Sequence, residues 1–206
     1  PDKTVEILES KGYAKNAEGY WEKDGEVLSL HIACHEGFIE KRRMAQVIVE
    51  ELQRIGIDAS MRLLAGGAWN DNRAFGDFET HMAWVACGSV NEPWASMDYF
   101  NTAWLVPIGE RANFNDGRWN TENAEAYSAL VNQIGVLPLG DPQIEELVVE
   151  AFRYWLADLP LIPTVQARKL VPFNTTYWTN WPTSENNYNQ PANWWMSLHQ
   201  MLHEIE

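Results

Sequence analysis

The fold is decided by residues 27–64, which read VLSLHIACHEGFIEKRRMAQVIVEELQRIGIDASMRLL. Residues 27–33 alternate between two faces as a half-buried strand does, and residues 57–64 alternate in the same way. Residues 41–55 carry apolar side chains at helical spacing, and Gly56 stands where a helix ends. The apolar stripe consists of Met44, Val47, Ile48, Leu52 and Ile55. A strand, a crossover helix and a second strand predict a right-handed parallel unit, and therefore an α/β fold.

Shorter elements are predicted on both sides of this unit. Residues 3–11 favour a helix that Gly12 ends, and residues 18–25 favour a polar hairpin. On the other side, Gly66-Gly67 is expected to open a loop through Trp69 and Asn72. The alternation of residues 78–86 predicts a third strand.

The second half of the chain is predicted to be mainly helical. Thr121 is a suitable N-cap for a helix that runs to Ile134, and Asp141-Pro142 is a typical helix start. We also expect helices around residues 96–104 and over residues 194–205, and a strand over residues 161–167. We expect one domain over residues 1–206, in which residues 171–206 form an aromatic-rich C-terminal tail.

The composition is that of a globular protein with an acidic surface. Among 206 residues, 15 are Lys or Arg and 29 are Asp or Glu, so the formal net charge is −14. That charge argues against binding to nucleic acids and to anionic membrane surfaces. No apolar run approaches the roughly 20 residues of a membrane helix. The chain begins with Pro1 and no signal peptide precedes it, so we expect a mature chain or a piece of a longer one.

Few residues suggest metal binding or catalysis. Cys34 and Cys87 are too few for a Cys₄ zinc site or an iron–sulfur cluster, and the sequence leaves their pairing open. His31 and His35 flank Cys34, but along a strand these histidines would lie about 13 Å apart. The common nucleophile, zinc-protease, phosphate-loop and dinucleotide-binding motifs are absent from the sequence. We therefore expect no metal, no cofactor and no enzymatic activity.

Acidic residues near the aromatic segment leave one enzymatic alternative open. Asp77, Glu79, Glu92 and Asp98 lie close to several tryptophans in the sequence. A glycosidase needs two carboxyl groups about 5–10 Å apart across a sugar, and the sequence does not fix such a distance. A glycoside-active enzyme or a free-standing carbohydrate-binding module is therefore the alternative function.

Tryptophan is the strongest functional signal, because 11 of the 206 residues are tryptophan. Aromatic faces beside polar residues suit stacking on sugars or on peptide side chains. The segment from Gly88 to Trp94 follows the strand predicted to contain Trp84, and loops at the carboxyl ends of strands favour ligand binding. The alternative is that these rings fill the core or dock another lobe. We predict that the ligand-binding residues are Trp84, Asn91, Glu92 and Trp94, with Trp69 and Trp104 behind them.

Six short motifs follow one another over residues 1–170. The first two are the helix that begins with Pro1-Asp2-Lys3 and leads to Leu8-Glu9-Ser10-Lys11-Gly12-Tyr13, and the hairpin 19–25 before Leu28-Ser29-Leu30. The next three are residues 45–52, the turn Ile55-Gly56-Ile57 and residues 76–79. The last, after the loop with Glu92-Pro93, is Asp158-Leu159-Pro160-Leu161-Ile162-Pro163. In this order they resemble the C-terminal part of the dipeptide/oligopeptide-type (family 5) extracellular solute-binding proteins of bacterial and archaeal ABC importers.

The resemblance implies a fold and a setting for the chain. The fold is one lobe of a type II periplasmic-binding-protein-like fold, with a mixed sheet and flanking helices. The implied protein is a monomeric, non-enzymatic receptor that is periplasmic or extracellular and carries a lipid anchor in its full-length form. Two lobes close over a solute and present it to a membrane permease, and the N-terminal lobe is missing from this sequence.

The resemblance also implies two ligand classes. In peptide-binding members, an Asp before a Pro in this loop holds the peptide amino group, and Glu92 before Pro93 takes that place here. The tail from Tyr177 to Trp195 is richer in tryptophan than the tails of peptide binders, and resembles members that bind cello-oligosaccharides. We expect an oligosaccharide or an oligopeptide, with the sugar favoured.

Overall fold

The computed structural model describes residues 2–84, 93–165, 172–186, 188–189 and 198–206. The chain divides into two compact units, Pro1–Leu161 and Ile162–Glu206, and each is described by itself. The assignment of the whole chain to one lobe with an aromatic tail remains a prediction. None of the helices in the described ranges has both the length and the apolar composition of a membrane span.

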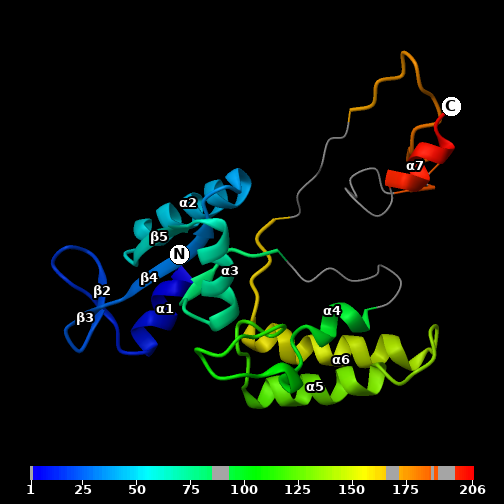
Figure 1. Ribbon diagram of the computed structural model, residues 1–206. Coiled ribbons are helices and arrows are strands. Elements are labelled where there is room, and N and C mark those ends of the chain that lie inside the picture. Colours follow the sequence, from blue (N-terminus) through cyan, green and yellow to red (C-terminus); the bar gives the residue numbers. More distant parts are fainter. Residues whose placement is uncertain (1, 85–92, 166–171, 187, 190–197) are drawn as a thin grey trace. The chain divides into compact units, whose positions relative to one another are not determined.

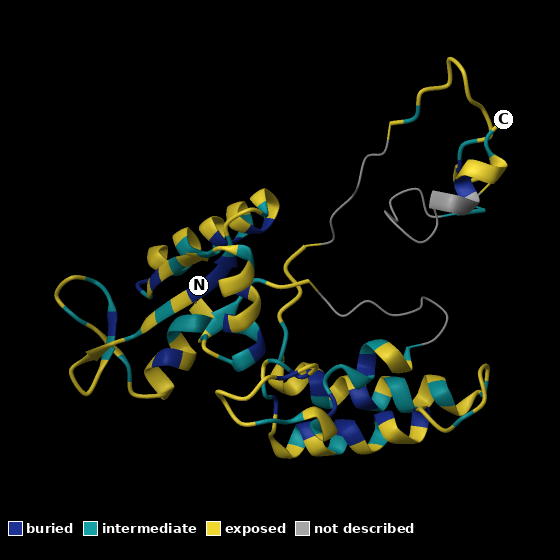
Figure 2. Cartoon of the chain, viewed as in Figure 1, coloured by how far each residue is buried: buried dark blue, intermediate teal, exposed yellow. Residues whose placement is uncertain are grey.

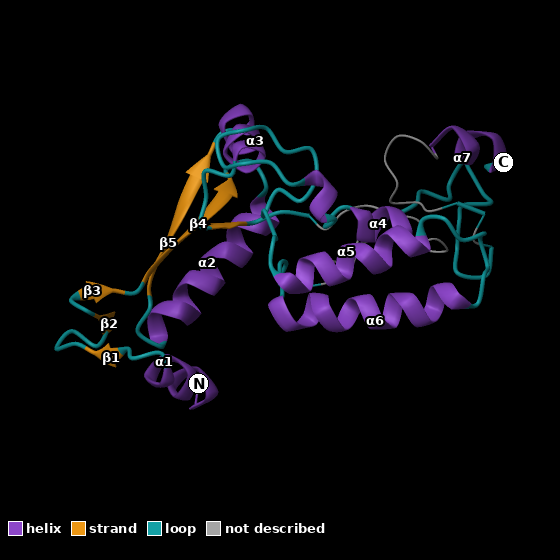
Figure 3. Cartoon of the chain, turned by 90° about the horizontal axis from the view of Figure 1, so that it is seen from below, coloured by secondary structure: helices purple, strands orange, loops and turns teal. Residues whose placement is uncertain are grey.

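A three-stranded parallel sheet is the centre of the first unit (Figure 1). The strand order is β5-β4-β6, with β4 (Ser29–His35) in the middle. Strand β5 (Asp58–Leu64) pairs with β4 from Ser29 opposite Asp58 to His35 opposite Leu64. Helix α2 (Ile39–Arg54) connects the two strands, so the predicted parallel unit is confirmed. Figure 3 shows α2 beside this sheet.

One face of α2 packs on the sheet and the other is exposed (Figure 2). The buried residues Ile32, Cys34 and Ala45 form a core against Ile48, Val49, Leu52, Met61 and Met82. Val47 was expected in this stripe but is exposed, because the buried face runs through Lys41, Ala45 and Ile48 instead. Gly56 ends the helical segment with a φ of +90°, and a Cβ there would lie 2.4 Å from the carbonyl oxygen of Gly19. Only glycine fits this turn.

The N-terminal elements agree with the sequence. Helix α1 (Asp2–Ser10) is followed by a small antiparallel sheet of β1 (Ala14–Lys15), β2 (Trp21–Lys23) and β3 (Glu26–Val27). Trp21 is buried, and its indole Nε1 donates to the carbonyl oxygen of Ile55 at 2.7 Å. This hydrogen bond fixes the small sheet to the end of α2.

Two predictions beside the parallel sheet were wrong. Residues 66–75 form helix α3 (Gly66–Phe75) instead of a loop, because burial of Trp69, Asn72 and Ala74 outweighs the low helix propensity of Gly66 and Gly67. The third strand, β6 (Thr80–His81), is much shorter than residues 78–86. It pairs only with Ile32 and Ala33 of β4, and residues 85 and 86 lie outside the described residues.

The rest of the first unit is helical. It contains α4 (Trp94–Asp98), the 3₁₀ turn η1 (Thr102–Trp104), α5 (Glu122–Ile134) and α6 (Gln143–Asp158). The hydroxyl of Thr121 accepts from the backbone N–H of Ala124, as the predicted N-cap requires. The carboxylate of Asp141 accepts from the N–H of Gln143 at 2.9 Å and begins α6 in the same way.

Helices α5 and α6 lie side by side and share one core (Figures 1 and 3). Its buried members are Met97, Trp119, Ala124, Tyr127, Val131, Ile134, Ala151 and Trp155. We call this set the helical core. Tyr127 donates its hydroxyl to the carbonyl oxygen of Met97 at 2.9 Å, which ties α4 to α5.

The second unit contains one described helix, α7 (Leu198–Glu204). The backbone of Thr179 exchanges hydrogen bonds with Glu206, and the rings of Phe173 and Trp181 stack with centroids 4.7 Å apart. Residues 161–165 are not a strand, contrary to the prediction for residues 161–167, of which 166 and 167 lie outside the described residues. The first part of the helix predicted over residues 194–205 also lies outside them.

Candidate ligand-binding site at the carboxyl edge of the sheet

The carboxyl ends of the three parallel strands lie at one edge of the sheet. Strand β4 ends at His35, β5 at Leu64 and β6 at His81, and α2 and α3 begin just beyond this edge. In open α/β sheets, ligands bind in the crevice outside the carboxyl ends of the strands. The side chains at this edge are therefore the first candidates for a ligand-binding site.

Six side chains gather at the edge, and we call them the edge cluster. They are His35, Phe38, Lys41, Trp69, His81 and Trp84. The Phe38 ring meets the edges of two indoles, with centroid distances of 4.6 Å to Trp84 and 6.2 Å to Trp69. His81 lies 4.8 Å from Trp69 on the other side. The rings therefore form one continuous aromatic surface.

Lys41 lies inside this aromatic surface. Its side chain is 1% exposed, and its Nζ is 3.2 Å from the ring centroid of Trp84 and 5.0 Å from those of Phe38 and Trp69. A cation over an aromatic face is attracted to the negative face of the ring. Burial nevertheless lowers the pKa of Lys41 to about 8, because the charged form loses its hydration.

Buried polar atoms without partners are concentrated in the edge cluster. Among the described residues, six buried side-chain nitrogen or oxygen atoms have no hydrogen-bond partner, and four of them belong to this cluster. They are Nζ of Lys41, Nε1 of Trp69 and both ring nitrogens of His81. Burial lowers the pKa of His81 to about 4, so the ring is neutral at pH 7. Such atoms are costly to bury unless something binds to them.

The structure brings together two of the predicted site residues. Trp69 and Trp84 both contact Phe38 and Lys41, and Trp69 is buried behind the more exposed Trp84. Asn91 and Glu92 lie outside the described residues. Their role in binding, like that of the predicted tryptophans, remains a proposal.

Trp94 and Trp104 belong to other surroundings in the helical part. Trp94 begins α4, and a Cβ on Gly135 would lie 2.4 Å from its Nε1, so the indole rests directly on the backbone. It lines an open groove of about 600 Å³ with Ile134, Leu137, Leu139, Asp141, Ile144, Glu145 and Val148, among others. Trp104 donates to the carboxylate of Asp98 at 3.0 Å and meets the ring of Phe114 edge-on at 5.0 Å.

Phe38, Lys41 and His81 are hard to predict as site residues from the sequence alone. A lysine near the start of a charged helix is usually solvated. The one available signal is spacing, because Lys41 lies four and seven positions before Ala45 and Ile48, on the apolar stripe. His81 could have been found from its place on the third strand, three residues before Trp84.

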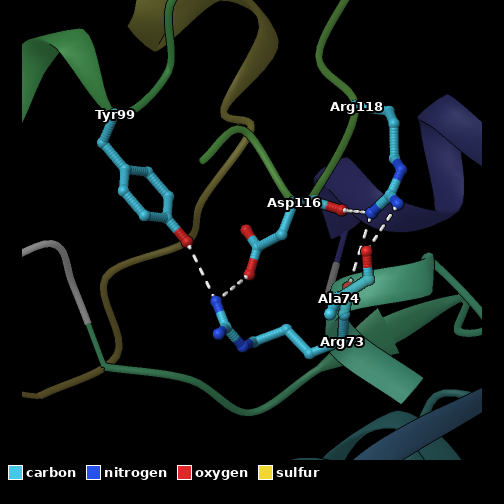
Figure 4. Close-up of polar contacts among 5 residues, drawn as sticks. All are labelled: Arg73, Ala74, Tyr99, Asp116 and Arg118. Carbon is cyan, nitrogen blue, oxygen red and sulfur yellow. Dashed lines mark hydrogen bonds and ion pairs between the residues drawn. The ribbon is translucent and has the colours of Figure 1, made fainter. Parts of the chain in front are cut away.

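A polar joint connects α3, the helix that carries Trp69, to the segment before α5 (Figure 4). Arg73 on α3 donates to the carboxylate of Asp116 at 2.8 Å and to the hydroxyl of Tyr99 at 3.5 Å. Burial disfavours the charged form of Arg73, but the hydrogen bond and charge of Asp116 outweigh this cost and raise its pKa. Arg118 donates to the carbonyl oxygens of Asp116 and Ala74. The joint therefore holds α3, which carries Trp69, against the segment before α5.

Comparison with known proteins gives relatives for this arrangement. No family model matches the chain. The oligopeptide-binding protein OppA of Lactococcus lactis subsp. cremoris (strain SK11) is 33% identical over 75 residues, which are 34% of this chain and 12% of the relative.

Solved structures match over more of the chain. The mannohexaose-bound periplasmic oligopeptide-binding protein of an oligopeptide ABC transporter from Thermotoga maritima has a TM-score of 0.79 at 24% identity. The match covers 100% of this chain and 39% of that chain. The oligopeptide-binding protein AppA from Bacillus subtilis, in complex with a nonapeptide, has a TM-score of 0.62 at 17% identity over 77% of this chain and 30% of its own.

These findings confirm the resemblance to oligopeptide-type solute-binding proteins and the predicted α/β lobe. The chain spans about two fifths of the Thermotoga protein and a smaller share of the other two relatives. All three relatives are named as binding proteins and none as an enzyme.

Proposed function

We propose that this chain is part of the substrate-binding component of an ABC importer, which captures an oligosaccharide or an oligopeptide outside the membrane. The observation that carries the proposal is the match of the whole chain to the Thermotoga binding protein. The edge cluster supports it, because unpartnered polar atoms and an exposed indole lie where open α/β sheets bind ligands.

Binding would combine stacking with directed hydrogen bonds. Trp84, which is 58% exposed, offers a face for stacking, and Trp69 and His81 hold ring nitrogens that have no partner among the described residues. We include Asn91, Glu92, Trp94 and Trp104 among the ligand-binding residues, as the sequence predicts. A second lobe from the rest of a longer protein would then close over the solute by a hinge motion.

An oligosaccharide is the favoured ligand. The Thermotoga relative is described with bound mannohexaose, and the many exposed aromatic residues of this chain suit sugar faces. An oligopeptide is the second candidate, because AppA is described with a nonapeptide and Glu92 could hold a peptide amino group.

The proposal also names partners and a place. The protein would act as a monomer, in the periplasm or outside the cell, with a lipid anchor in its full-length form. Its partners would be a membrane ABC permease and the remaining lobe, and it would bind no nucleic acid. The alternative is a glycoside-active enzyme or a free-standing carbohydrate-binding module.

The test is a titration of the complete natural protein that contains this chain. Cello-oligosaccharides and a mixed peptide library are added separately while tryptophan fluorescence is followed, and released sugars are assayed in parallel. We expect saturable binding without hydrolysis, and about a fivefold or greater loss of affinity in Trp84→Ala, if a sugar ring stacks on the indole as strongly as a nucleic-acid base stacks on an aromatic side chain, which contributes about 1–3 kcal/mol.

Phe152→Ala is the matched control. Phe152 is 42% exposed on α6, outside the edge cluster, so its truncation should leave affinity unchanged. Binding of peptides only would favour an oligopeptide as the ligand, with Glu92 holding the peptide amino group. Cleavage of the sugars would overturn the receptor proposal in favour of the enzyme.

A further inference from the structure

The ring of Trp84 separates a buried charge from solvent. Nζ of Lys41 lies 3.2 Å from the centroid of this ring, Lys41 is 1% exposed, and Trp84 is 58% exposed. Phe38 packs against Trp84 in a T-shaped arrangement with an interplanar angle of 66°, so the two rings do not stack flat on each other. The ring therefore contacts an ammonium group, while more than half of the residue's surface remains exposed.

No acidic side chain neutralises this ammonium group within the described residues. Each of the six recorded ion pairs joins other residues, although the chain has 29 acidic side chains. The charged and titratable groups that influence Lys41 are Cys34 on β4, Glu40 beside it on α2, and Arg73 on α3. The thiol of Cys34 is neutral at pH 7, because burial raises its pKa.

We propose that Lys41 is a specificity-determining residue, which holds Trp84 by one face and makes the opposite face prefer ligands that carry a carboxylate. This inference rests on the proposed function, because it concerns the ligand that Trp84 contacts. An isolated indole presents a negative face, which suits the C–H groups of neutral sugars. A cation behind the ring offsets that negative potential and attracts an anion in front of it, and the burial of Lys41 limits screening of its charge by water.

Carboxylates occur both in acidic sugars and in peptides, so the experiment compares two matched ligand pairs. One pair is trigalacturonic acid and its methyl ester, and the other is a peptide with a free carboxyl terminus and its amide. The complete natural protein, Lys41→Met and Lys41→Arg are titrated at pH 7 by calorimetry. The pair that binds identifies the source of the carboxylate.

We expect the wild type to prefer the acid of that pair by about tenfold, which corresponds to about 1.4 kcal/mol. Lys41→Met should lower the preference to less than about twofold, and Lys41→Arg should keep most of it. Equal preference in the wild type and Lys41→Met would overturn the inference and leave the proposed function standing. Failure of all four compounds to bind would overturn the carboxylate preference. The proposed function would still stand if cello-oligosaccharides or the peptide library bind, and would fall with it if neither binds.

A second measurement tests the contact without any ligand and guards against misfolding of Lys41→Met. The protein is labelled with 5-fluorotryptophan, and the ¹⁹F resonance of Trp84 is identified from its loss in Trp84→Phe. That resonance should shift with a midpoint near pH 8 in the wild type and in Cys34→Ser, as Lys41 loses its proton. It should not shift there in Lys41→Arg, and a shift that persists in Lys41→Arg would overturn the role of Lys41.

Discussion

The helical core and the edge cluster use equally buried tryptophans in different ways. Trp119 in the helical core and Trp69 in the edge cluster are each 6% exposed. The Nε1 of Trp119 donates to the carboxylate of Asp158 at 2.8 Å, whereas the Nε1 of Trp69 has no partner among the described residues. Burial alone therefore does not distinguish these two tryptophans, whereas the hydrogen bonding of their indole N–H groups does.

The largest effect is expected in the helical core. Trp119→Ala removes a buried indole that packs on Tyr127 at 5.1 Å and loses the hydrogen bond to Asp158. We expect the free energy of unfolding to fall by about 3–5 kcal/mol, measured by urea denaturation. Trp178→Ala, at a position 52% exposed, should change it by less than about 0.5 kcal/mol. A loss below about 1 kcal/mol in Trp119→Ala would contradict the structural role.

In the edge cluster, replacing a buried side chain should raise the stability of the protein at neutral pH, whereas Trp119→Ala lowers it. The pKa of Lys41 falls from 10.5 to about 8 on folding, so the charged lysine destabilises the folded state at neutral pH. Between about pH 8 and 10.5 the unfolded chain binds more protons, so stability rises with pH in this range. Relative to Lys41→Met, the wild type should gain up to about 3 kcal/mol over this interval.

Urea denaturation of both proteins from pH 7 to pH 10.5 measures this gain. The comparison with Lys41→Met is necessary because tyrosines also titrate near the upper end of the range. Lys41→Met should be the more stable protein at pH 7, since an apolar side chain replaces an unpartnered charge. If the free energy of unfolding changes with pH in the same way in the wild type and in Lys41→Met, the pKa of Lys41 is not lowered by folding.

Breaking the ion pair between Arg73 and Asp116, in the polar joint of Figure 4, should cause an intermediate loss of stability. Asp116→Asn leaves Arg73 half-buried without its carboxylate, although the amide oxygen can still accept one hydrogen bond. We expect a loss of about 1–3 kcal/mol, between the values for exposed and fully buried ion pairs. Glu51→Gln is the control, because Glu51 and Arg54 form an exposed pair whose loss should be within about 0.5 kcal/mol. Similar losses in both variants would show that the joint contributes no more than a surface pair.

The parallel unit could be predicted from the sequence because the strand pattern and the helix pattern are both periodic and uninterrupted. Residues 27–33 and 57–64 alternate, and Gly56 marks the end of the intervening helix. The same reasoning failed at Gly66-Gly67, where the local signal favours a loop but burial of Trp69 and Ala74 selects a helix. The third strand was predicted too long, because alternation continues past Thr80-His81 while pairing with β4 does not.

Part of the candidate site could also be predicted. Trp69 is predicted to follow the second strand and Trp84 to lie on the third, and both predictions depend on a topology that the sequence encodes strongly. Lys41 was not chosen, because a lysine on a helix reveals its burial only when the partners on neighbouring elements are known. The positions of Trp94 and Trp104 in the helical part could not be predicted, because residues 93–120 show no periodic pattern that indicates how this segment packs on α5.

The smallest change in stability is expected at Asp158, whose carboxylate accepts the hydrogen bond from Trp119 of the helical core. Asp158 accepts hydrogen bonds from Thr121, Trp119 and Asn123, and these bonds lower its pKa below 3.8. A carboxyl group with a lowered folded-state pKa stabilises the protein above the unfolded pKa, and that contribution disappears as the pH falls through the folded pKa. Asp158→Asn should therefore be less stable than the wild type at pH 7, and the difference should narrow below about pH 4.

Urea midpoints of the wild type and Asp158→Asn between about pH 2 and pH 7 measure this convergence. Asn123→Ala is an informative companion, because it removes one of the three donors and should give a smaller difference at neutral pH. If the two curves stay parallel down to about pH 2, the hydrogen bonds to Asp158 do not depend on its charge. The hydrogen bond from Trp119 would then contribute the same with a neutral acceptor as with a charged one, and the contrast with Trp69 would lie in having an acceptor at all.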